Sequence, residues 1–128
     1  MSKKLTEKQK RLKKRFTEAR GYWSEELWGN VLDLDPDFFE AYLNISSIPW
    51  EKGSLPPKIK EFIYIAFDAA ATHLYQPGLR QHIRNALKYG ATAQEIMEVF
   101  ELTSMLGIHT CTVGVPILAD ELGKTKKK

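Results

Sequence analysis

The chain has 128 residues, of which 43% are hydrophobic and 27% are charged, values typical of one soluble globular domain. This composition excludes a disordered or collagen-like chain, and the longest nearly apolar run, residues 62–71, is too short to cross a bilayer. No apolar stretch follows the N-terminal lysines, and the single cysteine, Cys111, cannot form a disulfide within the chain. We therefore predict a cytoplasmic protein with no signal peptide and no membrane span.

The formal net charge of +3 conceals two basic ends around an acidic body. Nine of the first 20 residues are Lys or Arg, and four lysines lie within residues 124–128. We divide the chain accordingly into a basic helix (1–20), a helical domain (21–123) and a basic tail (124–128). Nucleic-acid surfaces interleave aromatic with basic side chains, whereas the basic helix has one aromatic residue, Phe16. The pattern therefore favours a solvated helix, and no nucleic-acid partner is predicted.

Three helical segments are predicted in the first half of the chain. Residues 6–20 are nearly all good helix formers and end at Gly21. Residues 23–32 place apolar side chains at spacings of three and four. Asp35-Pro36 combines an N-cap acceptor with a ring that prefers the first helical position, so the third helix is expected to start there.

The second half begins with the most apolar helix, which is expected to start at Pro57 and to form the centre of the core. One face of this helix carries Ile59, Phe62, Ile63, Ala66, Phe67 and Ala70. A shorter helix is predicted between Pro77-Gly78 and a C-cap at Gly90. Thr92 and Glu95 match a capping box at the start of the next helix.

The last segment, residues 108–118, is rich in β-branched side chains and suits a strand by propensity. No second segment offers a strand to pair with it, so a helix packed on other helices is the more economical interpretation. The sequence therefore predicts an all-α fold of six or seven helices.

Three segments in a fixed order resemble the carboxymuconolactone decarboxylase family, which also holds the alkylhydroperoxidase D-like proteins. They are Lys-Glu-Phe-Ile (60–63), Gln-His-Ile-Arg-Asn-Ala-Leu (81–87) and Gly-Ala-Thr-Ala-Gln-Glu-Ile (90–96). The likeness extends over residues 53–118. It implies an alkylhydroperoxidase D-like helical bundle whose subunits assemble into trimers or hexamers. The large aromatic content of so small a domain is consistent with surface shared between subunits.

The sequence departs from the peroxidase branch of this family at two positions. Peroxidase-type members place a Cys-x-x-Cys pair four residues before the helix histidine, which corresponds to His82. The matching positions here hold Tyr75 and Gly78, so peroxidase chemistry that cycles a disulfide within one chain is not expected. No His-x-x-x-His or His-x-x-Glu-His spacing occurs either, and we predict no metal or other cofactor.

The resemblance makes His82 the first candidate catalytic residue, because an imidazole can donate or accept a proton near neutral pH. Glu61 matches the glutamate of the family's first helix and would hold or polarise that imidazole. Glu61, Asp68 and Thr72 are seven and eleven residues apart, so they are expected to form one polar stripe lining a cleft. The alternatives for this stripe are a solvent-facing seam or a salt bridge between subunits.

Four further candidates lie close to these residues in the sequence. His73 and Tyr75 are expected at the end of the most apolar helix, where either could hydrogen-bond to substrate. His73 falls on the apolar stripe, a position that is more often a buried structural histidine than a ligand. Arg80 and Arg84 are four residues apart on the outer side of the His82 helix. One of them could neutralise a substrate carboxylate, although a solvated helical face is the plainer interpretation.

By resemblance, the predicted function is decarboxylation of a small carboxylated lactone or related organic acid. His82 would deliver the proton, and Glu61 would orient the imidazole of His82. His73 or Tyr75 would hydrogen-bond to the substrate. Two alternatives remain open. One is an antioxidant, peroxiredoxin-like oxidoreductase that uses Cys111 across a subunit interface, and the other is a non-catalytic oligomer that binds a small ligand.

Overall fold

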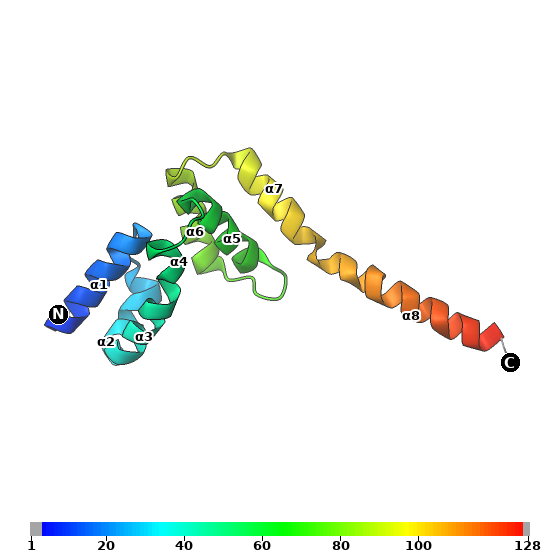
Figure 1. Cartoon of the computed structure of the whole chain (residues 1–128), viewed down its shortest axis with the longest axis horizontal. Helices are drawn as coiled ribbons and strands as arrows, with labels where there is room; N and C mark the ends of the chain where they lie inside the picture. Colours follow the sequence, from blue (N-terminus) through cyan, green and yellow to red (C-terminus); the bar gives the residue numbers. More distant parts are fainter. Residues whose placement is uncertain (1–3, 127–128) are drawn as a thin grey trace. The chain divides into compact units, whose positions relative to one another are not determined.

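The structure, a computed structural model, describes residues 4–126 and divides after Lys60 into two units. Residues 1–3 and 127–128, which include Lys3 and two lysines of the predicted basic tail, lie outside the described residues. All elements within the described range are helical and follow one another as shown in Figure 1. The all-α prediction is therefore confirmed, and the segment 108–118 is helical.

Local capping signals set the helix boundaries of the first unit. Thr6 accepts a hydrogen bond from the Gln9 amide at 3.2 Å while the Gln9 side chain accepts from the Thr6 amide at 2.8 Å. Gly21 ends that helix at a φ of 73°, and Asp35 caps a later helix by accepting from the Phe38 amide at 2.8 Å. The elements are α1 (Glu7–Arg20), a π-helical turn (Glu25–Gly29), α2 (Asn30–Leu34), α3 (Pro36–Ser46) and α4 (Ile48–Glu51).

The core of the first unit is an aromatic cluster around Phe16, which is fully buried. Its ring centroid lies 5.4 Å from those of Tyr22 and Trp23 and 6.1 Å from that of Phe39. Three leucines complete the buried cluster: Leu12, Leu32 and Leu43. The aromatic content of the first half of the chain is thus largely used inside one small unit.

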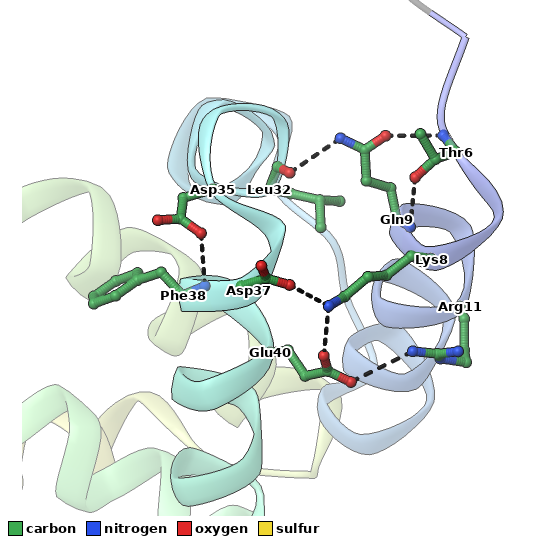
Figure 2. A network of polar contacts seen from close by, with 9 residues as sticks. All are labelled: Thr6, Lys8, Gln9, Arg11, Leu32, Asp35, Asp37, Phe38 and Glu40. Carbon is green, nitrogen blue, oxygen red and sulfur yellow. Dashed lines mark hydrogen bonds and ion pairs between the residues drawn. The ribbon is translucent and has the colours of Figure 1, made fainter.

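The basic side chains of α1 pair with acidic side chains of α3 within the same unit (Figure 2). Lys8 contacts Asp37 and lies 2.8 Å from Glu40, which also pairs with Arg11 at 3.4 Å. Hydrogen bonds to Asp37 and Glu40 raise the pKa of Lys8, and the bond from Lys8 lowers the pKa of Glu40. Much of the charge of this basic helix is therefore balanced by its own neighbours.

The second unit contains most of α5 and the elements that follow it. Thr92 and Glu95 form the predicted capping box, with amide contacts of 3.1 and 2.9 Å, and Gly90 has a φ of 87°. The buried core consists of Ile65, Ala86, Ala91 and Ile96. The elements are α5 (Pro57–Ala69), α6 (Gln76–Lys88), α7 (Ala93–Ser104), a 3-10 turn (Met105–Ile108) and α8 (His109–Lys126).

The buried face of α5 is not the predicted one. We expected its apolar stripe to form the centre of the core, but Ile63 is 49% exposed and Phe67 is 46% exposed. Besides Lys60, the buried positions are Glu61, Ile65 and Asp68, spaced four and three residues apart. The helix therefore turns its two carboxylates inward. Of its apolar stripe, Phe62 packs against the core, whereas Ile63 and Phe67 stay exposed in the part of the chain that the structure describes.

The predicted extent of α5 is also wrong. The helix ends at Ala69, and the chain then turns back so that the Tyr75 amide donates to the carbonyl oxygen of Asp68 at 2.8 Å. Thr72 is consequently exposed in a turn and does not continue the polar stripe. His73 is half-exposed and is not a buried residue of the apolar stripe.

The chain from α7 through α8 presents apolar side chains to solvent. Residues 93–125 include an 18-residue window with a mean hydropathy of 1.5, none of which is buried, so by length and composition this run could cross a bilayer. The expectation that no segment could cross a bilayer was based on residues 62–71 and did not consider residues 93–125. An apolar surface that meets another subunit gives the same pattern.

Candidate active site

Two buried carboxylates face α6 from α5. Glu61 is 1% exposed and Asp68 is 3% exposed, and their spacing of seven residues places them on one face of the helix. Burying a charged carboxylate is unfavourable unless it is paired and hydrogen-bonded. The hydrogen-bonding and charged partners of these two carboxylates therefore identify the candidate site.

Glu61 pairs with His82 on α6. Its Oε2 atom lies 2.6 Å from Nδ1 of His82, and its Oε1 atom accepts from Nδ2 of Asn85 at 3.3 Å. Asn85 in turn accepts from Gln81 at 2.9 Å. With Glu61 ionised, Nδ1 carries the hydrogen, and Nε2 is the ring nitrogen left to exchange a proton.

The imidazole of His82 is fixed on its other sides as well. The ring of Tyr64 stacks on it with centroids 4.4 Å apart and an angle of 8° between planes. Its Nε2 atom lies 3.8 Å from Oδ2 of Asp68, within ion-pair range but beyond hydrogen-bond length. A ring held by a carboxylate, a stacked phenol and a second carboxylate has little freedom to rotate.

Asp68 connects this buried pair with the turn after α5. Its Oδ1 atom lies 3.2 Å from Nε2 of His73, whose side chain is 52% exposed. The ring of Tyr75, 42% exposed, lies 5.7 Å from the ring of His73. The structure thus brings five of the sequence-predicted site residues together: Glu61, Asp68, His73, Tyr75 and His82.

The lack of a side chain at Gly78 leaves room for the carboxylate of Asp68. A Cβ atom at position 78 would lie 2.4 Å from Oδ2 of Asp68 and 2.6 Å from the ring of Tyr75. Any side chain there would collide with the carboxylate. Position 78 is where the sequence comparison expects the second cysteine of a Cys-x-x-Cys pair, so Asp68 occupies the space that this side chain would need.

Two predicted site residues lie elsewhere. Thr72 is exposed in the turn, and Arg80 is exposed on α6 at an angle of about 200° from His82 around the helix axis. Arg80 lines a cavity of about 580 Å³ together with Leu74, Gln76, Leu79, Ile83 and Arg84. The cavity does not include His82, and Arg80 does not join the buried carboxylates.

Sequence reasoning missed Tyr64, Asn85 and Tyr89. Tyr64 follows Glu61 by three residues and Asn85 follows His82 by three, so helical spacing from the two chosen residues could have found them. Tyr89 had no such signal, because it lies beyond the end of α6. Burial, followed by the nearby charge of Glu61, raises the pKa of Tyr89.

Neither metal nor thiol chemistry is assembled at this site. Within residues 4–126 no group of three His, Cys, Asp or Glu side chains is placed to hold a metal ion. Cys111 is exposed on α8. The side chains that the site brings together are an imidazole, whose ring nitrogens can exchange protons, and carboxylates, which accept hydrogen bonds.

The chain is an all-α protein with a carboxylate–imidazole pair buried between two neighbouring helices. The sequence matches the carboxymuconolactone decarboxylase family over residues 36–107, and the chain belongs to that family. A crystal structure of a chain from Burkholderia xenovorans LB400 matches it with a TM-score of 0.93 and 54% identity. That chain's own assignment as a gamma-carboxymuconolactone decarboxylase subunit is provisional.

The match covers 98% of the present chain and 50% of the Burkholderia chain, so the present chain spans about half the length of this relative. A comparison with curated proteins gives no significant match.

Proposed function

We propose that the protein decarboxylates a small carboxylated lactone or a related organic acid, with His82 as the proton donor. The observation that carries this proposal is the buried contact of 2.6 Å between Glu61 and His82. Membership of the carboxymuconolactone decarboxylase family supports the type of reaction. The substrate and the role of each residue are the proposed part.

The chemistry requires one proton at carbon. When the bond to the carboxylate breaks, CO₂ leaves and its electron pair stays on the substrate carbon, where an adjacent carbonyl can delocalise it. A protonated His82 donates from Nε2 to that carbon, while Nδ1–H stays hydrogen-bonded to Glu61. General acid catalysis of this kind is typically worth about 10²–10⁴-fold in rate. Tyr75, half-exposed beside Asp68, would hydrogen-bond to the substrate.

We expect His82→Gln to lower the rate of CO₂ release by about 10²–10⁴-fold, because glutamine cannot donate a proton to carbon. The measurement is CO₂ release from a panel of carboxylated lactones and β-keto acids. The matched control is His109→Gln, which removes an exposed histidine that contacts Thr112 on α8. Equal rates in wild type and His82→Gln would refute the assignment of His82, and no release from any substrate would favour a non-catalytic ligand-binding protein.

We further propose that the uncovered apolar surface of the second unit meets other copies of the chain, in a trimer or hexamer. The exposed apolar side chains of α8 are Val113, Val115, Ile117, Leu118 and Leu122, and α5 contributes Ile63 and Phe67. A surface of this kind marks an interaction site. The Burkholderia relative is described as a subunit, which agrees with assembly.

Leu118→Lys is expected to weaken this assembly at least tenfold, because burying a leucine contributes about 1.5–3 kcal/mol and 1.4 kcal/mol corresponds to tenfold. Sedimentation over a range of concentrations should give a wild-type mass that is a multiple of 14.7 kDa. Thr125→Lys, the same substitution at an exposed polar position on α8, is the control and should leave the mass unchanged. A monomeric wild type, or one recovered with lipid vesicles, would contradict the proposal.

A further inference from the structure

We propose that Asp68 and His73 form the path along which protons reach His82 from solvent. In this arrangement the buried carboxylate bridges two imidazoles, one inside the unit and one at its surface. As a supply route for the proton donor the path rests on the proposed function, but its existence can be tested without any substrate.

Distances and exposure together define the path. Nε2 of His73 lies 3.2 Å from Oδ1 of Asp68, and Oδ2 of the same carboxylate lies 3.8 Å from Nε2 of His82. The exposed fractions of the three side chains are 52% for His73, 5% for Asp68 and 11% for His82. His73 is thus the member of this chain of groups that is open to water.

The other nitrogen of His82 gives no comparable route. Nδ1 contacts Glu61, which is 1% exposed, and Asn85, which is 2% exposed, lies beyond it. An amide side chain does not take up and release protons near neutral pH. The phenol of Tyr89 is also near Glu61, but burial and then the charge of Glu61 raise its pKa above the ordinary value, so it does not release its proton near neutral pH. Protons exchanged at His82 therefore arrive on the Nε2 side, where Asp68 lies.

The turn after α5 holds His73 against Asp68 in a strained conformation. Leu74 has a φ of 46°, a left-handed conformation that is unfavourable for a residue with a Cβ atom. The turn is held by hydrogen bonds from the amides of His73 and Leu74 to the Ala70 carbonyl and from the Tyr75 amide to the Asp68 carbonyl. Strain of this kind persists only where the surrounding structure enforces it, and it is concentrated at functional sites.

The transfer proceeds in two steps that conserve protons and charge. The imidazolium of His73 gives its Nε2 proton to Oδ1 of the Asp68 carboxylate, which leaves a neutral imidazole and a carboxylic acid. Rotation of that acid about its Cβ–Cγ bond presents the proton to the lone pair on Nε2 of neutral His82. A displacement of less than about 1 Å reduces the gap of 3.8 Å to hydrogen-bond length. Solvent then returns a proton to His73.

The test is the rate at which the ring protons of His82 exchange with water, followed by NMR on the full chain labelled with ¹⁵N-histidine. His73→Gln should slow this exchange at least tenfold, and added free imidazole should restore it by taking the vacated surface position. Asp68→Asn should slow exchange equally, and combining the two substitutions should add nothing. His109→Gln, on α8, is the control and should leave the rate unchanged.

An exchange rate in His73→Gln within twofold of wild type would overturn the path, and so would slowed exchange that imidazole does not restore. His73 is half-exposed, so its variant remains a valid test even where Asp68→Asn fails to fold. Exchange that depends on His73 in a protein that releases no CO₂ would refute the proposed function alone. CO₂ release with unchanged exchange in His73→Gln would refute the path alone.

Discussion

Glu61→Ala is expected to lower the free energy of unfolding by about 3–5 kcal/mol, because breaking one partner of a buried pair leaves the other uncompensated. The substitution removes the acceptor for Nδ1 of His82 and for the amide of Asn85, both of which stay buried. Urea denaturation followed by circular dichroism measures the change. The control is Glu98→Ala on α7, an exposed position where the effect should stay within about 0.5 kcal/mol.

A double substitution separates the pair from its surroundings. Replacing both Glu61 and His82 by leucine removes the ionisable groups together, so it should cost much less than the sum of the two single substitutions. A loss below about 1 kcal/mol in Glu61→Ala would show that the pair does not contribute to stability. Additive effects of the two leucine substitutions would show that the contact of 2.6 Å is not coupled energetically.

Gly78→Ala should destabilise the protein by about 1–3 kcal/mol, the usual cost of overpacking. The new Cβ atom would lie 2.4 Å from Oδ2 of Asp68, a short buried side chain already held between two histidines. Intrinsic helix propensity predicts the opposite sign, since alanine is favoured over glycine by about 0.8–1 kcal/mol inside a helix. Whether Gly78→Ala lowers or raises the free energy of unfolding therefore tests whether position 78 lies against the carboxylate of Asp68.

The control for this substitution is Gly123→Ala on α8, where a Cβ atom would meet nothing within 4 Å. It should be neutral or stabilising by up to about 1 kcal/mol. Both variants are compared by urea denaturation, and Gly78→Ala should also reduce CO₂ release because Asp68 is displaced from His82. A stabilised Gly78→Ala protein would show that Asp68 moves aside at no cost.

Local chemistry explains which parts of the fold the sequence could predict. Gly21, Asp35 and Thr92 act through hydrogen bonds or backbone angles within a few residues of themselves, so the helix boundaries they set could be predicted without the tertiary structure. The segment 108–118 is helical, as predicted from the lack of a second segment in the sequence that could pair with it as a strand. His82 and Glu61 could be chosen by resemblance, which supplies residue identities but no geometry.

The errors on α5 have a physical cause. Periodicity shows that a helix has an apolar stripe, but it does not show whether the same chain covers that stripe. Here the chain buries the opposite face, because Glu61 and Asp68 find hydrogen-bonding and charged partners on α6 and in the following turn. No Gly or Pro follows Ala69 closely, so the end of the helix and the left-handed Leu74 had no local signal.

The sequence by itself therefore determined the helical class, most helix boundaries, the family likeness and the pairing candidates Glu61 and His82. The tertiary structure alone decided that Asp68 lies between two histidines, that position 78 must lack a side chain, and that Thr72 and Arg80 stand apart from this group. The two kinds of result differ because the interactions behind them act over different separations along the chain. Caps and propensities act over a few residues along the chain, whereas the burial of a carboxylate depends on partners that only folding brings within reach.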